Sequence, residues 1–236
     1  MAAFAMASIQ PMSAQENKEP VDMGKIMRTY FAPRVLSPEV HADQTVTFRY
    51  LAPNAQSVEL NGQFLKKNLP MTKDENGVWS VTTGKVKPDI YPYEFIVDGT
   101  RVMDPGNADF FPNENFKGSI LEVPDDQPMA YSIQNVPHGN VEYVMYDSPS
   151  IGVTGRMCIY TPPGYDPKGD KKYPVFYCIS GTTDTEEVYF KVGRANFILD
   201  NLIAAGKAEP MIVVMPYGNP MAWFEQGAEM PRIDLF

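Results

Sequence analysis

Nucleophilic catalysis by a serine needs a serine in a nucleophile elbow and a histidine that can act as its base. This sequence contains two histidines, His41 and His138, in 236 residues. None of its serines has glycine at both the second position before it and the second position after it, so no Gly-x-Ser-x-Gly nucleophile elbow is present. We expect neither histidine to act as a base. His41 lies among short strands, and His138 precedes the predicted sheet, where a structural role near a domain junction is expected.

The stretch from Tyr173 to Pro216 carries the candidate chemistry instead. An apolar run of strand length leads into the polar turn Ser180-Gly181-Thr182-Thr183-Asp184. A segment with helical period follows over residues 193–207, and a second apolar run covers residues 211–216. This order predicts a β-loop-α-β unit, the building block of a parallel sheet. Gly181 permits a tight turn, and backbone N–H groups are donors whatever the side chains are.

The preceding half of the chain predicts short antiparallel strands. Segments such as residues 45–50, 78–82 and 91–97 alternate with period two, and Asn61-Gly62 and Asp98-Gly99 are turn signals. Strands at this spacing indicate an immunoglobulin-like β-sandwich. Residues 105–128 show no clear period. Within them, the loop Asp109-Phe110-Phe111-Pro112-Asn113 carries two aromatic rings, as do many loops that pack against a neighbouring domain.

The pattern predicts an all-β sandwich followed by a second domain built on a parallel sheet. The residues before the sandwich resemble the apolar core of a secretory signal with a cleavage site near Ser13-Ala14, although the basic leading segment is missing; a disordered apolar tail is the alternative. The expected segments are a signal-like remnant over 1–15, a linker over 16–33, the sandwich over 34–126 and the parallel-sheet domain over 127–236.

Composition excludes several classes of partner. The net charge is −9 and no block of Lys and Arg occurs, so nucleic acid is not an expected partner. No run of about 18 apolar residues is present, so we expect no membrane-spanning helix. The two cysteines, Cys158 and Cys178, each lie in an apolar run, which favours small buried side chains over a disulfide between neighbouring strands.

A first resemblance lies in the sandwich. The order Asn61-Gly62, Gly77-x-Trp79, Tyr91-x-Tyr93-x-Phe95 and Val97-Asp98-Gly99 resembles the early-set immunoglobulin-like modules related to carbohydrate-binding family 48. The resemblance implies that exposed aromatic rings could stack on sugars, with Trp79, Tyr91 and Tyr93 as candidates. The alternative is that these rings belong to the core, which their period-two spacing favours.

A second resemblance covers about a hundred residues of the second half. The motif Tyr160-Thr161-Pro162-Pro163-Gly164-Tyr165, the run Tyr173-Pro174-Val175 and residues 193–203 and 210–218 resemble the esterase-D-like α/β-hydrolases, which include carbohydrate esterases of family 1. Together with the sandwich, the chain is similar to two-domain carbohydrate esterases of gut and rumen Bacteroidetes. The resemblance implies a secreted or cell-surface serine carboxylic ester hydrolase that removes feruloyl or acetyl groups from plant-cell-wall xylan. It implies that residues 127–236, the hydrolase part, are the first part of an α/β-hydrolase domain with an incomplete parallel sheet. It implies no metal and no organic cofactor.

The same resemblance assigns roles within the turn. The Thr182 N–H is the expected oxyanion donor, with Thr183 and Gly181 as further candidates. Where the family usually has His-Gly, this chain has Ser180-Gly181. An ordinary strand-to-helix loop, in which Thr183 or Asp184 caps a helix through residues 185–187, is an alternative that can hold at the same time.

The rest of the machinery is expected downstream of Phe236, since the last 18 residues contain neither serine nor histidine. We therefore expect the 236 residues alone to be inactive. An incomplete parallel sheet would leave an unpaired edge and make this chain prone to aggregation. Trp223 in the tail could stack on an aromatic acyl group.

Two other functions remain open at this point: a non-catalytic carbohydrate-binding or scaffold protein, and an enterochelin-type siderophore esterase. The ester that is cleaved and the oligomeric state are open as well.

Overall fold

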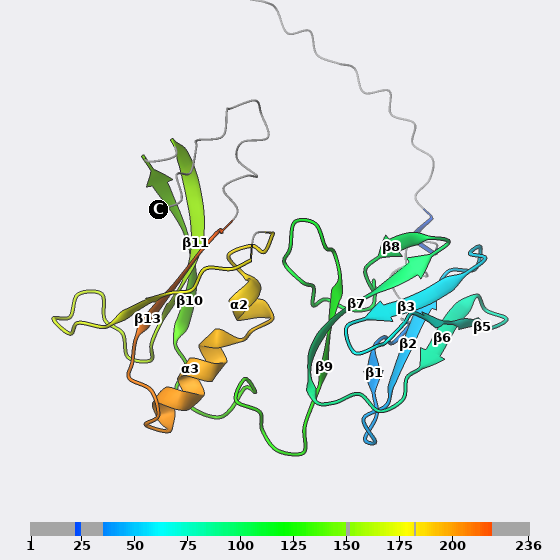
Figure 1. Cartoon of the computed structure of the whole chain (residues 1–236), viewed down its shortest axis with the longest axis horizontal. Coiled ribbons are helices and arrows are strands. Elements are labelled where there is room, and N and C mark those ends of the chain that lie inside the picture. The colour runs from blue at the N-terminus through cyan, green and yellow to red at the C-terminus, as the bar shows by residue number, and fades with distance from the viewer. Residues whose placement is uncertain (1–21, 25–34, 150–151, 182, 219–236) are drawn as a thin grey trace, which may run out of the picture. The chain divides into compact units, whose positions relative to one another are not determined.

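The computed structural model describes residues 22–24, 35–149, 152–181 and 183–218 (Figure 1). The signal-like segment over 1–15 and Trp223 lie outside these residues. Val35 and the described residues after it belong to one compact unit. In the described residues this unit contains the two sheets of the sandwich and a third sheet.

The first sheet of the sandwich has four strands in the order β1-β2-β6-β5, all antiparallel. Their bounds are Glu39–Val40 for β1, Val46–Leu51 for β2, Thr72–Lys73 for β5 and Val78–Thr82 for β6. The register pairs Tyr50 with Trp79 and Phe48 with Val81. The predicted strand pattern of this region is therefore confirmed.

The second sheet has the order β4-β3-β7-β8, and β9 also pairs with β7. Its strands are Val58–Gly62 for β3, Leu69–Pro70 for β4, Asp89–Val97 for β7, Thr100–Val102 for β8 and Ser119–Val123 for β9. Phe48, Leu60, Tyr93 and Phe95 are fully buried between the two sheets. The ring centroids of Phe48 and Tyr93 lie 4.9 Å apart in an edge-to-face arrangement, the favourable geometry for aromatic pairs.

Strand β9 lies in the segment where the sequence showed no period. Its burial explains why: Ser119, Ile120, Leu121 and Val123 are all buried, and only Glu122 is partly exposed. A strand covered on both faces has no alternation of polar and apolar residues for a period to reveal. The sandwich therefore includes this strand as its last element.

The third sheet forms the hydrolase part and has the order β10-β11-β13-β12. Its strands are Asn140–Ser148 for β10, Val153–Thr161 for β11, Val175–Tyr177 for β12 and Ile212–Pro216 for β13. Only β12 and β13 are parallel among these pairs, and helices α2 (Val188–Lys191) and α3 (Ala195–Ala204) connect them. The predicted β-loop-α-β unit is confirmed (Figure 1).

Strand β12 ends this sheet on one side. Val175, Phe176 and Tyr177 are 49%, 55% and 65% exposed, although apolar and aromatic side chains of a hydrolase sheet are normally covered. The unpaired edge and uncovered apolar surface that the incomplete sheet predicted are therefore present in the described residues. The aggregation that we expect from them stays a prediction.

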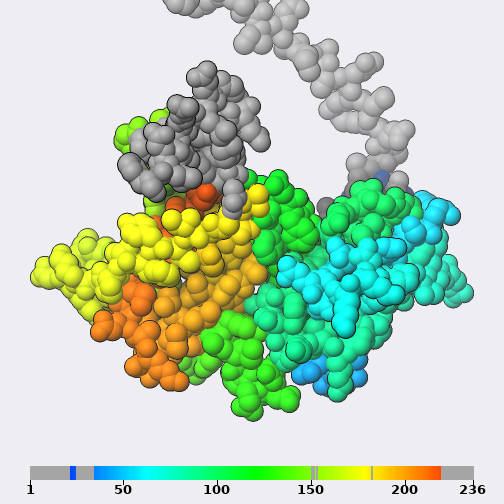
Figure 2. All heavy atoms as spheres, viewed as in Figure 1, coloured from blue at the N-terminus to red at the C-terminus, as the bar shows by residue number. Residues whose placement is uncertain are grey.

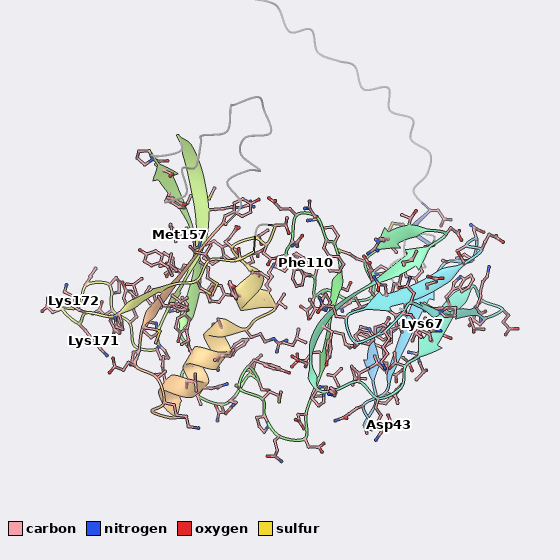
Figure 3. All side chains as sticks on the ribbon, viewed as in Figure 1. Asp43, Lys67, Phe110, Met157, Lys171 and Lys172 are labelled. Carbon is pink, nitrogen blue, oxygen red and sulfur yellow. The ribbon has the colours of Figure 1, made fainter. Side chains whose placement is uncertain are left out.

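A charged loop joins β11 to β12. Residues 166–172 are exposed. The loop projects from the surface in yellow tones in Figure 2, and Lys171 and Lys172 lie at its outer end in Figure 3. The candidate oxyanion donors lie in the next loop along the chain, after β12.

Candidate functional site

The loop after β12 begins where strand pairing ends. The Cys178 N–H donates to the Val214 carbonyl at 2.9 Å, which extends the pairing of β12 with β13 by one residue. The chain then turns tightly: the Asp184 N–H donates to the Gly181 carbonyl at 3.1 Å. A Cβ atom at position 181 would lie 3.1 Å from Oδ2 of Asp184, closer than most real contacts of this kind. The small residue at 181 thus suits this turn.

The backbone donors of this loop divide into two groups. The N–H groups of Asp184 and Thr185 are both used, the second in a 3.0 Å hydrogen bond to the Pro112 carbonyl. Those of Gly181 and Thr183 donate to no other residue that the structure describes. Thr182 lies outside the described residues. The role of Gly181 and Thr183 as oxyanion donors stays a prediction.

The capping alternative for this loop is wrong. Helix α2 begins at Val188, its N-cap is Glu187, and no side chain caps it. The Asp184 carboxylate and the Thr183 hydroxyl are instead bound by the amide of Asn113, at 2.7 and 2.9 Å. The side chains that could have capped a helix are thus engaged by another part of the chain.

That other part is the loop between β8 and β9 of the sandwich. Asn113 forms an isolated β-bridge with Asp184, and the Glu114 N–H donates to the Thr183 carbonyl at 2.8 Å. Many loops with two aromatic rings pack against a neighbouring domain, and the loop at residues 109–113 contacts the hydrolase part through this bridge. The role of Asn113 itself had no signal in the sequence, because its partner lies about seventy positions away.

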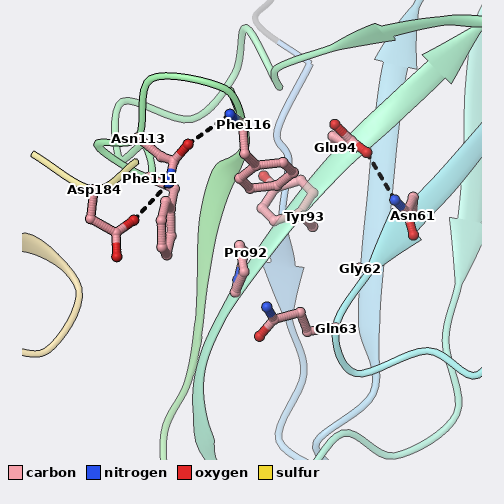
Figure 4. A pocket seen from close by; sticks show the side chains of 10 residues that line it. All are labelled: Asn61, Gly62, Gln63, Pro92, Tyr93, Glu94, Phe111, Asn113, Phe116 and Asp184. Carbon is pink, nitrogen blue, oxygen red and sulfur yellow. Dashed lines mark hydrogen bonds between the residues drawn. The ribbon is translucent and has the colours of Figure 1, made fainter. Parts of the chain in front are cut away.

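A cavity of about 340 Å³ lies beside this contact (Figure 4). The lining combines aromatic rings with polar side chains from the sandwich and from the loop after β12. Its residues are Asn61, Gly62, Gln63, Pro92, Tyr93, Glu94, Phe111, Asn113, Phe116 and Asp184. Glu94 is almost fully buried and accepts hydrogen bonds from Asn61, at 2.8 Å, and from Arg101. The buried carboxylate is therefore paired, as its burial requires.

The carboxylates that follow the loop are paired as well. Glu186 forms an ion pair with Arg156 at 3.0 Å, and Glu187 accepts a 2.6 Å hydrogen bond from the Tyr143 hydroxyl. Burial raises the pKa of Glu187, but hydrogen bonds from Lys191 and Tyr143 outweigh it and leave the pKa below its usual range. These partners offset negative charge close to the loop, which favours a site that must accept a developing anion.

The three aromatic candidates for sugar binding lie in or against the sandwich core. Trp79 is 7% exposed and its indole N–H donates to the Ala52 carbonyl at 2.9 Å. Tyr93 is fully buried and donates to Asp104 at 2.8 Å. Tyr91 is half-buried, with its ring edge-to-face with Phe64. Of the three, only Tyr91 keeps an accessible part, and the sugar-binding role stays a prediction.

Both histidines have local partners. His41 Nε2 lies 2.7 Å from the Thr47 hydroxyl in the sandwich. His138 Nδ1 lies 2.8 Å from Oδ2 of the buried Asp200, and its ring packs edge-on against Phe197. These contacts agree with the structural role expected of His138. The two cysteines are free thiols: Cys158 is buried and Cys178 is partly buried.

The structure places a β-sandwich before a sheet with a parallel crossover, and comparison with known families divides the chain in the same way. Residues 36–111 match carbohydrate-binding module 48 (isoamylase N-terminal domain), and residues 148–232 match the putative esterase family. The chain therefore joins a carbohydrate-binding module 48 domain to an esterase domain.

Two curated relatives are similar in sequence. An endo-1,4-beta-xylanase/feruloyl esterase of Xylanibacter ruminicola is 36% identical over 186 residues, which is 77% of this chain and 26% of that protein. Endo-1,4-beta-xylanase Y of Acetivibrio thermocellus is 40% identical over 70 residues, 29% of this chain and 6% of that protein. The chain thus spans about a quarter of the first relative and far less of the second.

Among solved structures, enterochelin esterase from Shigella flexneri superposes with a TM-score of 0.55 at 15% identity, over 80% of this chain and 56% of that one. At this identity the likeness concerns the fold alone. It supports an architecture in which a sandwich precedes a hydrolase sheet. No helix in the described residues is long and apolar enough to cross a membrane.

Proposed function

We propose that this chain is part of a secreted serine carboxylic ester hydrolase that removes feruloyl or acetyl groups from plant-cell-wall xylan. The observation that carries the proposal is the 36% identity to a xylanase/feruloyl esterase over 186 residues. That length exceeds either the sandwich or the hydrolase part, so the similarity includes both. The loop after β12 supports the proposal because it presents backbone N–H groups beside paired carboxylates.

In the proposed reaction a serine oxygen attacks the ester carbonyl and the carbonyl oxygen becomes an oxyanion. N–H groups of residues 181–183 stabilise that oxyanion, with Thr182 as the first candidate and Thr183 and Gly181 as the others. Collapse of the intermediate expels the sugar hydroxyl and leaves an acyl-enzyme, which water then hydrolyses. The serine, aspartate and histidine are proposed to come from sequence after Phe236, and Trp223 is proposed to contact the acyl group.

The direct test uses the full-length protein, with the natural sequence that adjoins these 236 residues. It is incubated with methyl ferulate, acetylated xylan and a ferric siderophore ester, and the released acids are quantified. Release of ferulate or acetate supports the proposal. Hydrolysis of the siderophore ester alone favours the second candidate, an enterochelin-type esterase. That candidate is considered because the Shigella flexneri enterochelin esterase has a similar fold.

The sandwich supports a further candidate, a protein that binds carbohydrate without catalysis, because residues 36–111 match carbohydrate-binding module 48. Retention of the full-length protein on insoluble xylan, lost in Tyr91→Ala and kept in a Tyr50→Ala control from the other sheet, would support binding through Tyr91. Retention together with an absence of ester hydrolysis would favour this candidate over the esterase.

Export is proposed on the signal-like residues 1–15. Expression of the full-length protein in a bacterial host, with mass spectrometry of its N-terminus in the exported fraction, tests it. Cleavage near Ser13-Ala14 is the expected result, and an intact N-terminus retained inside the cell would contradict export.

A further inference from the structure

Two backbone hydrogen bonds, one on each side of Asn113, hold the candidate oxyanion loop against the sandwich. The Glu114 N–H donates to the Thr183 carbonyl at 2.8 Å, and the Thr185 N–H donates to the Pro112 carbonyl at 3.0 Å. Asn113 lies between them and forms the bridge with Asp184. A short piece of β-pairing therefore fixes residues 183–185 against the sandwich rather than against their own sheet.

The side chain of Asn113 completes this contact. It is 7% exposed, and its amide makes four hydrogen bonds. Oδ1 accepts from the N–H groups of Asn115 and Phe116, both at 2.8 Å, which fixes the conformation of the sandwich loop. Nδ2 donates to the Asp184 carboxylate at 2.7 Å (Figure 4). It also donates to the Thr183 hydroxyl at 2.9 Å. All hydrogen-bonding capacity of this buried amide is directed to the two loops that it joins.

We propose that Asn113 is a positioning residue for ester hydrolysis. Thr183 is held through its carbonyl and its hydroxyl at once, so the sandwich restrains the residue whose N–H is a candidate oxyanion donor. Oxyanion stabilisation depends on donors that are already aimed before the reaction begins. The inference rests on the proposed function, and it makes the sandwich a part of the catalytic apparatus in addition to any contact with carbohydrate.

The hydrogen-bond donor at position 113 and the acceptor at position 184 can be exchanged by substitution, so that the hydrogen bond is kept in the opposite direction. In Asn113→Asp, a carboxylate replaces the amide donor and faces Asp184, so two negative groups meet where a hydrogen bond was. In the double variant Asn113→Asp with Asp184→Asn, the new amide at 184 can donate to the new carboxylate at 113. The other carboxylate oxygen can still accept from the N–H groups of residues 115 and 116, and the Thr183 hydroxyl can turn to donate.

Steady-state kinetics of the full-length protein on p-nitrophenyl acetate tests the proposal. We expect Asn113→Asp to lower kcat by about 10- to 100-fold, because a displacement of about 1 Å at a reacting centre has effects of that size. KM should change by less than about threefold, and the double variant should recover kcat to within about threefold of wild type, since the two sites are directly coupled. An unchanged kcat in Asn113→Asp, or a double variant as slow as the single one, overturns the proposal.

A matched control distinguishes positioning of the loop by Asn113 from a general contact between the sandwich and the hydrolase part. Glu122 on β9 forms a 2.6 Å ion pair with Arg194, which immediately precedes α3, and this is a second contact between sandwich and hydrolase part. Glu122→Gln weakens that contact but leaves the loop alone. We expect its kcat to stay within about twofold of wild type, because sites without shared partners act independently. If Glu122→Gln lowers kcat as much as Asn113→Asp does, the proposal is overturned, because any loss of contact between the two parts would then have the same effect.

Hydrogen exchange supplies a readout that needs no activity. In Asn113→Asp the backbone amides of residues 184 and 185 should exchange at least about tenfold faster than in wild type, and the double variant should restore protection. If the wild-type protein hydrolyses no ester, the proposed function fails, and exchange alone then decides whether Asn113 holds the loop. Unchanged exchange in Asn113→Asp overturns the inference whether or not the protein is an esterase.

Discussion

The Tyr160 hydroxyl donates a 2.7 Å hydrogen bond to Oδ1 of Asp200, and this bond joins strand β11 to helix α3. Asp200 is 1% exposed and also accepts from the Gly139 N–H at 2.9 Å, while its other oxygen lies 2.8 Å from His138 Nδ1. A buried carboxylate is tolerated when each oxygen has partners of this kind. The helix of the parallel crossover is therefore fixed both to the sheet and to the segment that enters it.

Removal of the Tyr160 hydroxyl should destabilise the hydrolase part. We expect Tyr160→Phe to lower the free energy of unfolding by about 1.5–3 kcal/mol, because hydrogen bonds to charged groups contribute that much and the buried Asp200 loses a donor. Urea denaturation of the full-length protein measures the change. Tyr165→Phe is the control, since Tyr165 is exposed, and equal losses in the two variants would contradict the account.

The buried Asp104 should make the stability of the sandwich depend on pH. Burial raises its pKa, against the hydrogen bonds from Ser37, Tyr93 and the Gly106 N–H, which lower it. A raised pKa means that the folded state favours the protonated form. The stability contribution is therefore fully present below the ordinary pKa of about 4 and is lost as pH rises through the raised value.

Asp104→Asn removes this titration and gives the measurement. The difference in free energy of unfolding, wild type minus variant, should fall as the pH rises from about 4, the ordinary value for Asp, to neutrality. Urea denaturation at a series of pH values provides it. A difference that stays constant, or that grows with pH, would show that Asp104 does not titrate as its burial implies.

The sequence predicted the features that neighbouring residues indicate, and it missed those that depend on contacts between distant residues. Alternation revealed strands such as β2 and β7, and the apolar runs on either side of Gly181 revealed the parallel crossover. The buried strand β9 has no alternation, so periodicity missed it. The capping role of Thr183 and Asp184 was reasonable from their residue types, but Asn113 takes up both side chains, and nothing near them in the sequence indicates that partner.

The two cysteines should differ in reactivity. Burial raises the pKa of Cys158 to about 12, with the neighbouring Glu186 and Glu187 adding to it, so almost no thiolate exists at neutral pH. Cys178 is less buried, and its pKa is also raised by burial. Iodoacetamide labelling of the native protein, with peptide mass spectrometry, should label Cys178 slowly and Cys158 only after denaturation. Rapid labelling of Cys158, or a disulfide-linked peptide pair, would contradict this.

The most direct test of the account is the release of acid from xylan by the full-length protein. Feruloylated and acetylated xylan are incubated with the protein, and ferulic and acetic acid are quantified with and without a serine-directed organophosphate. We predict release of one or both acids, abolished by the reagent, because acyl transfer to a serine is the proposed chemistry. No release of either acid, or release that survives the reagent, would contradict the proposed serine esterase.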